Sequence, residues 1–190
     1  MNTIDYYNKN AELYFENTVK ADMSDCQNRF LNYLKPDSYI LDLGCGSGRD
    51  SKFFISKGHR VKAIDGSKQM CLLASNYIGQ EVDCVEFRKI NYINEFDAIW
   101  ACASLLHVNK NDIDDVIKRI YKALKNDGYF YCSFKYGNSV TIQNERYFNN
   151  LNEEQLKELI EDFEIVELWS SNDVRPDRID KWINAIAKKT

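Results

Sequence analysis

Proline, histidine and long hydrophobic runs are scarce in this sequence. Of its 190 residues, two are proline and two are histidine. No apolar run approaches the roughly 20 residues that a bilayer-spanning helix needs, so we expect no transmembrane segment. His59 and His107 each lack a second ligand at a metal-binding spacing, and the sequence therefore predicts no metal site.

Excess positive charge and paired cysteines are also missing. The formal net charge is −4 and the pI is near 5.3, which argues against a protein that binds nucleic acid through a broadly basic surface. The six cysteines are scattered and include no CxxC pair, and the polar N-terminus "MNTIDYYNKN" has no apolar segment of a signal peptide. We therefore expect a cytoplasmic protein with reduced cysteines.

Hydrophobic periodicity predicts an α/β fold. Alternating strands and helices indicate a mostly parallel sheet that is covered by helices on both faces. Two successive strands at the end of the chain indicate an antiparallel hairpin at one edge. We expect strands at 39–43, 60–65, 83–90, within 96–105, and at 129–137, 164–172 and 181–189, and helices at 3–18, 23–34, 49–58, 67–79, 111–128 and 152–163.

The order of these elements predicts a single domain over residues 1–190. A helical cap (1–35) precedes a core (36–190), with no linker or repeat between them. Ser67 is an expected helix N-cap, and Asn152 with Gln155 has the spacing of a capping box.

The segment "YILDLGCGSGRD" (39–50) carries the main functional signal. An apolar strand ends at Leu43, and Gly44, Gly46 and Gly48 alternate with small residues before a helix begins. Glycines let the backbone approach a ligand closely and adopt positive φ, and the following helix N-terminus offers free N–H donors. Ligands of open α/β sheets bind beyond the carboxyl ends of the strands, so we expect this loop to contact a polar ligand.

Three loop types compete for this pattern. A P-loop requires G-x-x-x-x-G-K-[ST], and the chain has no such lysine. A dinucleotide fingerprint requires G-x-G-x-x-G, but counted from Gly44 its last position is Arg49. A ligand made of a nucleoside and an amino acid requires an acid for its ribose hydroxyls. Asp65 ends "RVKAID", 21 residues after Gly44, and a carboxylate can accept two hydroxyl hydrogen bonds, which favours the third type.

The segment "ILDLGCGSGRD" resembles the first motif of class I S-adenosylmethionine-dependent methyltransferases. "FDAIWACASLLHV" (96–108) resembles the fourth strand of that family and the segment after it. "IYKALKNDGYFYCSF" (120–134) resembles its helix, turn and fifth strand, with Asn126 and Asp127 in place of Pro and Gly. The likeness covers nearly the whole chain, and similar sequences are often described as tellurite-resistance-type methyltransferases. It implies a Rossmann-like seven-stranded sheet, the cofactor S-adenosylmethionine and methyl transfer.

The resemblance also implies a set of cofactor contacts. The family commonly has an acid after its third strand that binds the adenine amino group. This chain has "RKIN" there, so Lys89, Ile90 or Asn91 is expected to line the pocket instead, with backbone groups bonding the base. Asp42 could instead accept a hydrogen bond from the loop backbone without contacting the cofactor. The N-terminal tyrosines could instead be part of the core. The expected contacts are Tyr14, Asp42, Gly44, Cys45, Gly46, Asp65, Gly66, Ser67, Lys89, Ile90, Ala101 and Leu106.

A base and an acceptor pocket complete the expected site. Methyl transfer depends mainly on placing the nucleophile in line, and a hydroxyl, amine or thiol acceptor also needs a base. His107 is the candidate because its charge can change near neutral pH; the alternative is a structural histidine that bonds the loop backbone. Residues 138–150 are expected to form a mobile lid.

Cations and aromatics near the ends of the last strands indicate an acceptor with an anionic or planar part. The alternative for each is an ordinary surface residue. The expected acceptor contacts are Lys135, Tyr136, Arg146, Tyr147, Arg175, Arg178 and Trp182.

Several functions stay open at this level. The chain has no N/D-P-P-Y motif and no appended RNA-binding domain, which favours a small-molecule acceptor. The alternatives are a tRNA or RNA methyltransferase, a non-catalytic cofactor-binding scaffold, and an NAD-dependent oxidoreductase that the glycine spacing disfavours. A monomer or a homodimer is expected.

Overall fold

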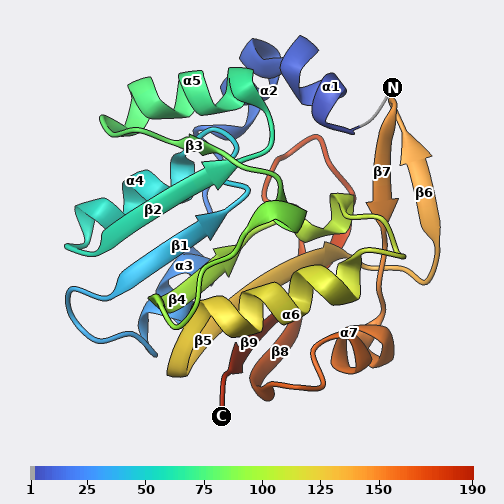
Figure 1. Cartoon of the computed structure of the whole chain (residues 1–190). Helices are drawn as coiled ribbons and strands as arrows, with labels where there is room; N and C mark the ends of the chain where they lie inside the picture. Colours follow the sequence, from blue (N-terminus) through green and yellow to red (C-terminus); the bar gives the residue numbers. More distant parts are fainter. Residues whose placement is uncertain (1–2) are drawn as a thin grey trace.

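A seven-stranded sheet forms the centre of the computed structural model, which describes residues 3–190 (Figure 1). Its strand order is β3-β2-β1-β4-β5-β9-β8. The first five strands are parallel, β9 is antiparallel to β5, and β8 is antiparallel to β9. The predicted Rossmann-like sheet with a C-terminal antiparallel hairpin is therefore confirmed. The strands are β1 (Tyr39–Leu43), β2 (Arg60–Asp65), β3 (Asp83–Cys84), β4 (Phe96–Ala101), β5 (Leu124–Lys135), β8 (Glu164–Asn172) and β9 (Lys181–Lys188).

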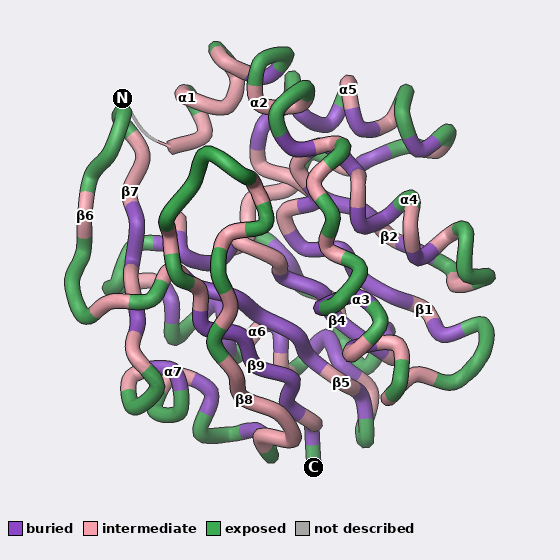
Figure 2. Tube along the Cα trace, turned by 180° about the vertical axis from the view of Figure 1, so that it is seen from behind, coloured by how far each residue is buried: buried purple, intermediate pink, exposed green. Residues whose placement is uncertain are grey.

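Helices cover both faces because successive strand residues point to opposite sides. Ile40 packs with α3, α4 and α5 on one face, and its neighbour Leu41 packs with α6 and α7 on the other. Figure 2 shows how completely the central strands are buried between these layers. The helices are α1 (Thr3–Lys9), α2 (Ala11–Thr18), α3 (Ser24–Leu31), α4 (Arg49–Ser56), α5 (Lys68–Ile78), α6 (Ile113–Ala123) and α7 (Glu153–Leu159), with 3-10 turns η1 (Phe87–Lys89) and η2 (Leu105–His107).

The expected cap includes two kinds of helix. Helices α1 and α2 contact α5 and lie near the carboxyl ends of the strands (Figure 1), whereas α3 packs on the sheet face itself. Met1 and Asn2, where the cap was expected to begin, lie outside the described residues. The division into cap (1–35) and core stays a prediction.

Two predicted helix starts are confirmed by their hydrogen bonds. The Ser67 hydroxyl accepts from the backbone N–H of Met70 at 3.3 Å at the start of α5. At α7, Asn152 accepts from the N–H of Gln155 at 2.9 Å, and the Gln155 side chain accepts from the N–H of Asn152 at 3.1 Å. Each bond satisfies a donor that has no partner within its own helix.

Three predicted elements differ from the structure. The helix expected at 3–18 is interrupted at Asn10, whose side-chain amide and backbone N–H both donate to the Tyr6 carbonyl. The strand expected at 83–90 ends at Cys84, because the chain leaves the sheet edge and turns into η1. The helix expected at 111–128 ends at Ala123, and Leu124 already pairs with Phe96 as the start of β5.

The expected lid at 138–150 is a second, two-stranded sheet. Strands β6 (Val140–Gln143) and β7 (Arg146–Asn149) pair in antiparallel fashion. Asn144 and Glu145 both have positive φ, 50° and 63°, as a two-residue hairpin turn of type I′ requires. The mobility of this hairpin stays a prediction.

Candidate functional site

The glycine loop after β1 contains three glycines with positive φ, and the first two line the cavity described below. Gly44 and Gly46 have φ of +81° and +53°. The N–H groups of Gly44 and Cys45 both donate to the Ile64 carbonyl, at 2.9 and 3.0 Å, which ties the loop to the end of β2. A Cβ atom at Gly44 would lie 2.6 Å from the Cβ of Ser104. The close approach of the two loops therefore requires glycine here.

Asp65, the last residue of β2, is fixed by backbone donors. Its Oδ2 accepts from the N–H of Gly46 at 3.0 Å, and its Oδ1 accepts from the N–H of Ser67 at 2.8 Å. Burial raises the pKa of Asp65 above its usual value, and these backbone hydrogen bonds oppose the rise. Because each carboxylate oxygen has two lone pairs, the group can accept further hydrogen bonds from a ligand.

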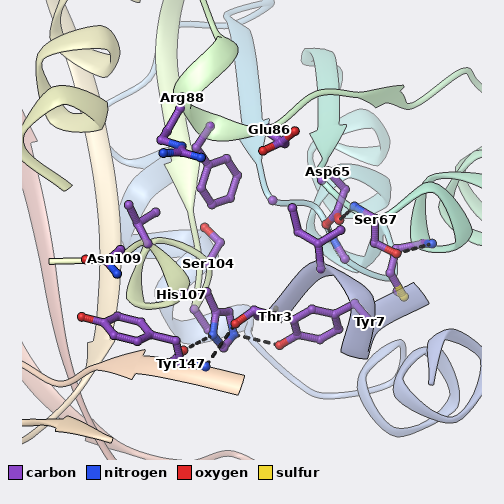
Figure 3. A pocket seen from close by; sticks show the side chains of 18 of the residues that line it. Thr3, Tyr7, Asp65, Ser67, Glu86, Arg88, Ser104, His107, Asn109 and Tyr147 are labelled. Atoms are coloured by element: carbon purple, nitrogen blue, oxygen red, sulfur yellow. Dashed lines mark hydrogen bonds between the residues drawn. The ribbon is translucent and has the colours of Figure 1, made fainter. Parts of the chain in front are cut away.

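A cavity of about 680 Å³ opens between the glycine loop, β2, η1 and η2. This volume lies in the range of small-molecule sites. Figure 3 shows Asp65 and Ser67 on one side of this cavity and His107 on another. Among the expected cofactor residues, those that line it are Tyr14, Gly44, Gly46, Asp65, Gly66 and Ser67.

The region after β3 differs from the expectation. Lys89 is exposed and forms an ion pair with Glu86 at 2.5 Å, and Ile90 is buried in the core, so neither lines a cavity. Glu86, Phe87 and Arg88 line the cavity instead. An acid, Glu86, thus lines the cavity three residues before Lys89, because β3 is shorter than its apolar pattern predicts. That early end of the strand leaves no signal in the residue types alone.

Asp42 lies beneath the glycine loop and lines neither cavity. Its Oδ2 accepts from the Ser51 hydroxyl at 2.6 Å. Burial, and then the neighbouring charge of Asp50, raise the pKa of Asp42 to about 8. Burial alone would also raise the pKa of Asp50, but Arg49 and donors from Gln27 and Trp100 hold it below its usual value.

His107 is held between α1 and β7. Its Nδ1 lies 2.7 Å from the Tyr147 carbonyl oxygen; a carbonyl only accepts, so Nδ1 carries the proton. Nε2 therefore accepts from the Tyr7 hydroxyl at 2.8 Å (Figure 3). Burial lowers the pKa of His107 to about 4, and the charges of Arg146 and Lys135 add to this. The ring is neutral at neutral pH with both nitrogens engaged, which favours the structural alternative; the base role stays a prediction.

A second cavity, of about 400 Å³, shares a wall with the first. The shared residues are Tyr7, Tyr14, Gly44, Gly46, Ala103 and His107. Cys45 and Leu106 line only this second cavity, whereas Ala101 is buried in the core and lines neither. Expected acceptor residues that line the second cavity are Lys135, Arg146, Arg175, Arg178 and Trp182.

Two expected acceptor residues lie elsewhere. Tyr136 is 43% exposed, lines neither cavity, and has the Lys181 ammonium 4.9 Å from its ring centroid. Tyr147 lines the first cavity rather than the second, and its hydroxyl accepts from the Lys110 N–H at 3.0 Å. The structure thus brings most of the expected acceptor set together and leaves these two outside it.

In the turn after β4, Ala103 and Ser104 were not among the expected contacts. Ala103 has φ of +50°, which is uncommon for a residue with a Cβ, and its N–H donates to the Ser133 hydroxyl at 2.8 Å. The Ser104 hydroxyl donates to the Leu43 carbonyl at 2.6 Å. These bonds hold the turn against the glycine loop, and both residues line the first cavity. Among residues 3–190, no cluster of three potential ligands could hold a metal ion, and no helix is long and apolar enough to cross a bilayer.

Comparison with known proteins gives a family match for the middle of the chain. Residues 40–128 match the model of a methyltransferase domain. An uncharacterized methyltransferase of Staphylococcus carnosus is 26% identical over 122 residues, which are 60% of this chain and 59% of that protein. The chain therefore spans less than two thirds of that curated relative.

Solved structures resemble the chain over nearly its whole length. The 1,6-didemethyltoxoflavin-N1-methyltransferase of Burkholderia thailandensis, with its acceptor and S-adenosylhomocysteine bound, has a TM-score of 0.81 at 21% identity, covering 98% of this chain and 85% of that one. TehB from Haemophilus influenzae has a TM-score of 0.76 at 18% identity, covering 95% and 67%. At these identities the likeness establishes the fold.

Proposed function

We propose that the chain is an S-adenosylmethionine-dependent methyltransferase with a small-molecule acceptor, because residues 40–128 match the model of a methyltransferase domain and the fold resembles that of the Burkholderia thailandensis methyltransferase. The observation that carries the proposal is the fixed position of the Asp65 carboxylate. Its carboxylate is fixed by the N–H groups of Gly46 and Ser67 at the edge of the first cavity. A fixed acid at the end of the second strand suits a pair of ribose hydroxyls.

The residues of the first cavity fit this cofactor. Gly44 and Gly46 place bare backbone in the wall of this cavity, and Gly44 lets the Ser104 turn approach closely. Glu86 adds an acceptor for an amino group, and Phe87 adds an aromatic surface for a flat base. When bound, S-adenosylmethionine supplies a methyl group on a positively charged sulfur. After transfer of the methyl group, the rest of the cofactor leaves as a neutral thioether.

The second cavity supports a small-molecule acceptor. Its volume of about 400 Å³ suits a small organic ligand. It meets the first cavity at Tyr7, Tyr14 and His107, so an acceptor there would lie beside the cofactor. The acceptor bound to the Burkholderia thailandensis protein is also a small molecule. Placing the acceptor in line is the main task of the protein in such a transfer.

Thermal unfolding with S-adenosylmethionine, S-adenosylhomocysteine, NAD and ATP tests the cofactor assignment. A ligand at one hundred times its Kd stabilises the folded state by about 2.7 kcal/mol, which raises the Tm of a chain of this size by about 5–10 °C. We expect this shift with the two adenosyl ligands and its loss in Asp65→Ala. A shift with NAD alone would contradict the proposal.

Asp97→Ala is the matched control. Asp97 also accepts a backbone N–H, from Tyr39 at 2.8 Å, but it lies at the start of β4, at the opposite end of the sheet. We expect it to lower the Tm while the ligand-induced shift persists. Loss of the shift in both variants would mean that general destabilisation, and not a lost ligand contact, explains the result for Asp65→Ala.

A further inference from the structure

Most of the positive charge in the second cavity is already neutralised. Five basic side chains line it, and Arg178 among them is exposed to solvent. Three others have a carboxylate partner: Arg49 with Asp50 at 2.8 Å, Lys135 with Asp180 at 3.0 Å, and Arg175 with Asp173 at 2.6 Å. A cation that already has a partner offers little to a ligand, since binding would first break the ion pair.

Arg146 differs from these residues. No carboxylate among residues 3–190 forms an ion pair with it. Its guanidinium lies 4.6 Å from the ring centroid of Tyr6, 5.1 Å from that of Phe148 and 5.9 Å from that of Tyr7. Its Nε is buried and has no hydrogen-bond partner. Arg146 is therefore a cation enclosed by aromatic rings with an unused donor.

The charge of Arg146 acts where the two cavities meet. It contributes, after burial, to the lowered pKa of His107, and it opposes the burial that raises the pKa of Tyr7. Both residues line both cavities. A negative group bound to Arg146 would thus lie close to the cofactor side of the acceptor cavity.

The surroundings of Arg146 limit the kind of anion that fits. An aromatic ring attracts a cation only weakly, and this attraction does not replace a counter-charge for a partly buried guanidinium. Arg146 balances a single negative charge; the other cation of this cavity without an ion pair among the described residues, Arg178, is exposed to solvent, where water weakens its attraction for the second charge of a phosphate dianion. A guanidinium edge matches the two oxygens of a carboxylate, and the rings of Phe148 and Trp182 in the cavity suit a flat ligand.

We propose that Arg146 binds the carboxylate of the methyl acceptor and that the acceptor is a small aromatic monocarboxylate. This assignment rests on the proposed function, because it places that acceptor in the second cavity. It selects one residue from the wider cationic set that the sequence indicated. The carboxylate serves as the anchor, and the ring fills the space between β7 and the β8–β9 loop.

Direct binding to the protein saturated with S-adenosylhomocysteine tests this assignment. The probes are matched pairs in which only the charge changes: benzoate and benzamide, nicotinate and nicotinamide, indole-3-carboxylate and indole-3-carboxamide. Saturation-transfer NMR titrations detect affinities down to the millimolar range. We expect at least one carboxylate to bind at least tenfold more tightly than its amide, and Arg146→Gln to reduce that ratio to below about twofold. Arg146→Lys, which keeps the charge but not the two-pronged edge, should give an intermediate ratio.

A control variant and a cofactor-binding measurement distinguish a failure of the proposed function from a failure of the role of Arg146. Arg60→Gln, at the start of β2 far from the cavity, should keep the wild-type ratio, and S-adenosylhomocysteine should bind Arg146→Gln as it binds the wild type. Absence of S-adenosylhomocysteine binding to the wild type would overturn the proposed function. Normal S-adenosylhomocysteine binding without any carboxylate preference, or a preference that persists in Arg146→Gln and disappears in Arg178→Gln, would overturn the role of Arg146 alone.

Discussion

The two cavities at the carboxyl end of the sheet differ in whether backbone or side chains form their walls. The first is shaped by backbone: Gly44 and Gly46 supply bare peptide groups, and Asp65 is held by two N–H donors. The second is shaped by side chains, among them the ion pair Lys135–Asp180 between segments far apart in sequence and the local ion pair Arg175–Asp173.

The backbone of the first cavity belongs to the fold, whereas the side chains of the second cavity can differ between chains that share the fold. Backbone conformation after β1 and β2 depends on a few local residues, so a cofactor site built from it can persist while the rest of the chain changes. The ion pair between β5 and the β8–β9 loop, and the one within that loop, can be exchanged without altering the sheet. We therefore expect substitutions in the first cavity to affect folding and ligand binding together, and substitutions in the second to affect selectivity.

Gly44→Ala should have the largest effect. The new Cβ would lie 2.6 Å from Ser104 Cβ and 2.9 Å from Phe87 Cζ, at a φ of +81°. Left-handed backbone costs a residue with a Cβ about 1–2 kcal/mol, and overpacking adds about 1–3 kcal/mol. We expect urea unfolding to show a loss of about 3 kcal/mol and calorimetry to show no S-adenosylhomocysteine binding.

Gly58→Ala is the control for backbone strain. Gly58 has a similar φ of +86°, but a Cβ there would meet nothing within 4 Å. It should lose only about 1–2 kcal/mol and keep its ligand affinity. Equal losses in both variants would contradict the argument that the Ser104 turn packs against the loop.

The first cavity could be predicted from sequence because its determinants are local. Gly44 and Gly46 follow a strand directly, Asp65 ends the next strand, and Ser67 caps the next helix. Each of these roles depends on neighbours within a few residues, so residue type and spacing reveal it. The position of Glu86 was missed because the length of β3 depends on its place at the sheet edge, which no local pattern encodes.

The second cavity could be predicted only as a group of residue types. The sequence indicates cations and aromatics near the last strands, but it does not show which cation has a partner. Arg175 is paired with Asp173 two residues away, whereas Lys135 is paired with Asp180 across the β5–β9 pair. Arg146 stands apart only once these pairs are known. The sequence alone therefore could not show which cation of the second cavity lacks a carboxylate partner.

His107→Ala should have the next largest effect, because it removes a connection between η2, α1 and β7. The imidazole exchanges hydrogen bonds with Tyr7 and with the Tyr147 carbonyl. Each is worth about 1 kcal/mol, and partners left unsatisfied add to the loss. We expect about 2–3 kcal/mol less stability in urea unfolding at pH 7.5.

The pH dependence of this effect has a defined sign. The pKa of His107 is about 4 in the folded chain and about 6.5 when unfolded, so the unfolded state binds more protons as pH falls from 6.5 to 4. Wild type should lose stability over that range, and His107→Ala should lose less. His59→Ala is the matched control, because the His59 Nδ1 has no hydrogen-bond partner. An equal effect of the two alanines would contradict the structural role of His107.

Asp42→Asn should change stability in the opposite pH direction. Burial raises the pKa of Asp42 to about 8, so its protonated form stabilises the folded chain at low pH, and this contribution is lost as pH rises from about 4 to about 8. Each unit of pKa change is worth about 1.4 kcal/mol. Between pH 6 and pH 8 we expect the stability of the variant relative to wild type to rise by about 2 kcal/mol, measured by urea unfolding.

Asp97→Asn should show the opposite pH dependence of stability in the same measurement. Burial alone would raise the pKa of Asp97, but Lys125 and the Tyr39 N–H hold it below its usual value. Its contribution is present at neutral pH and is lost as pH falls, so the variant should be less stable than wild type at pH 7 and approach it in acid. The same direction of change in both variants would contradict the assigned charge state of Asp42.

Tyr136→Ala should have the smallest effect and marks the boundary of the second cavity. The exposed ring contacts the Lys181 ammonium at 4.9 Å, and an exposed cation–π contact is worth about 0.5–1 kcal/mol. Trp182, by contrast, lines the cavity and donates from Nε1 to Asp173 at 3.2 Å. In the titrations with aromatic carboxylates, Trp182→Ala should weaken binding, and Tyr136→Ala should leave it unchanged. If Tyr136→Ala weakened binding as much as Trp182→Ala, the acceptor would extend beyond the cavity toward β9, and the wider set of contacts indicated by the sequence would be right.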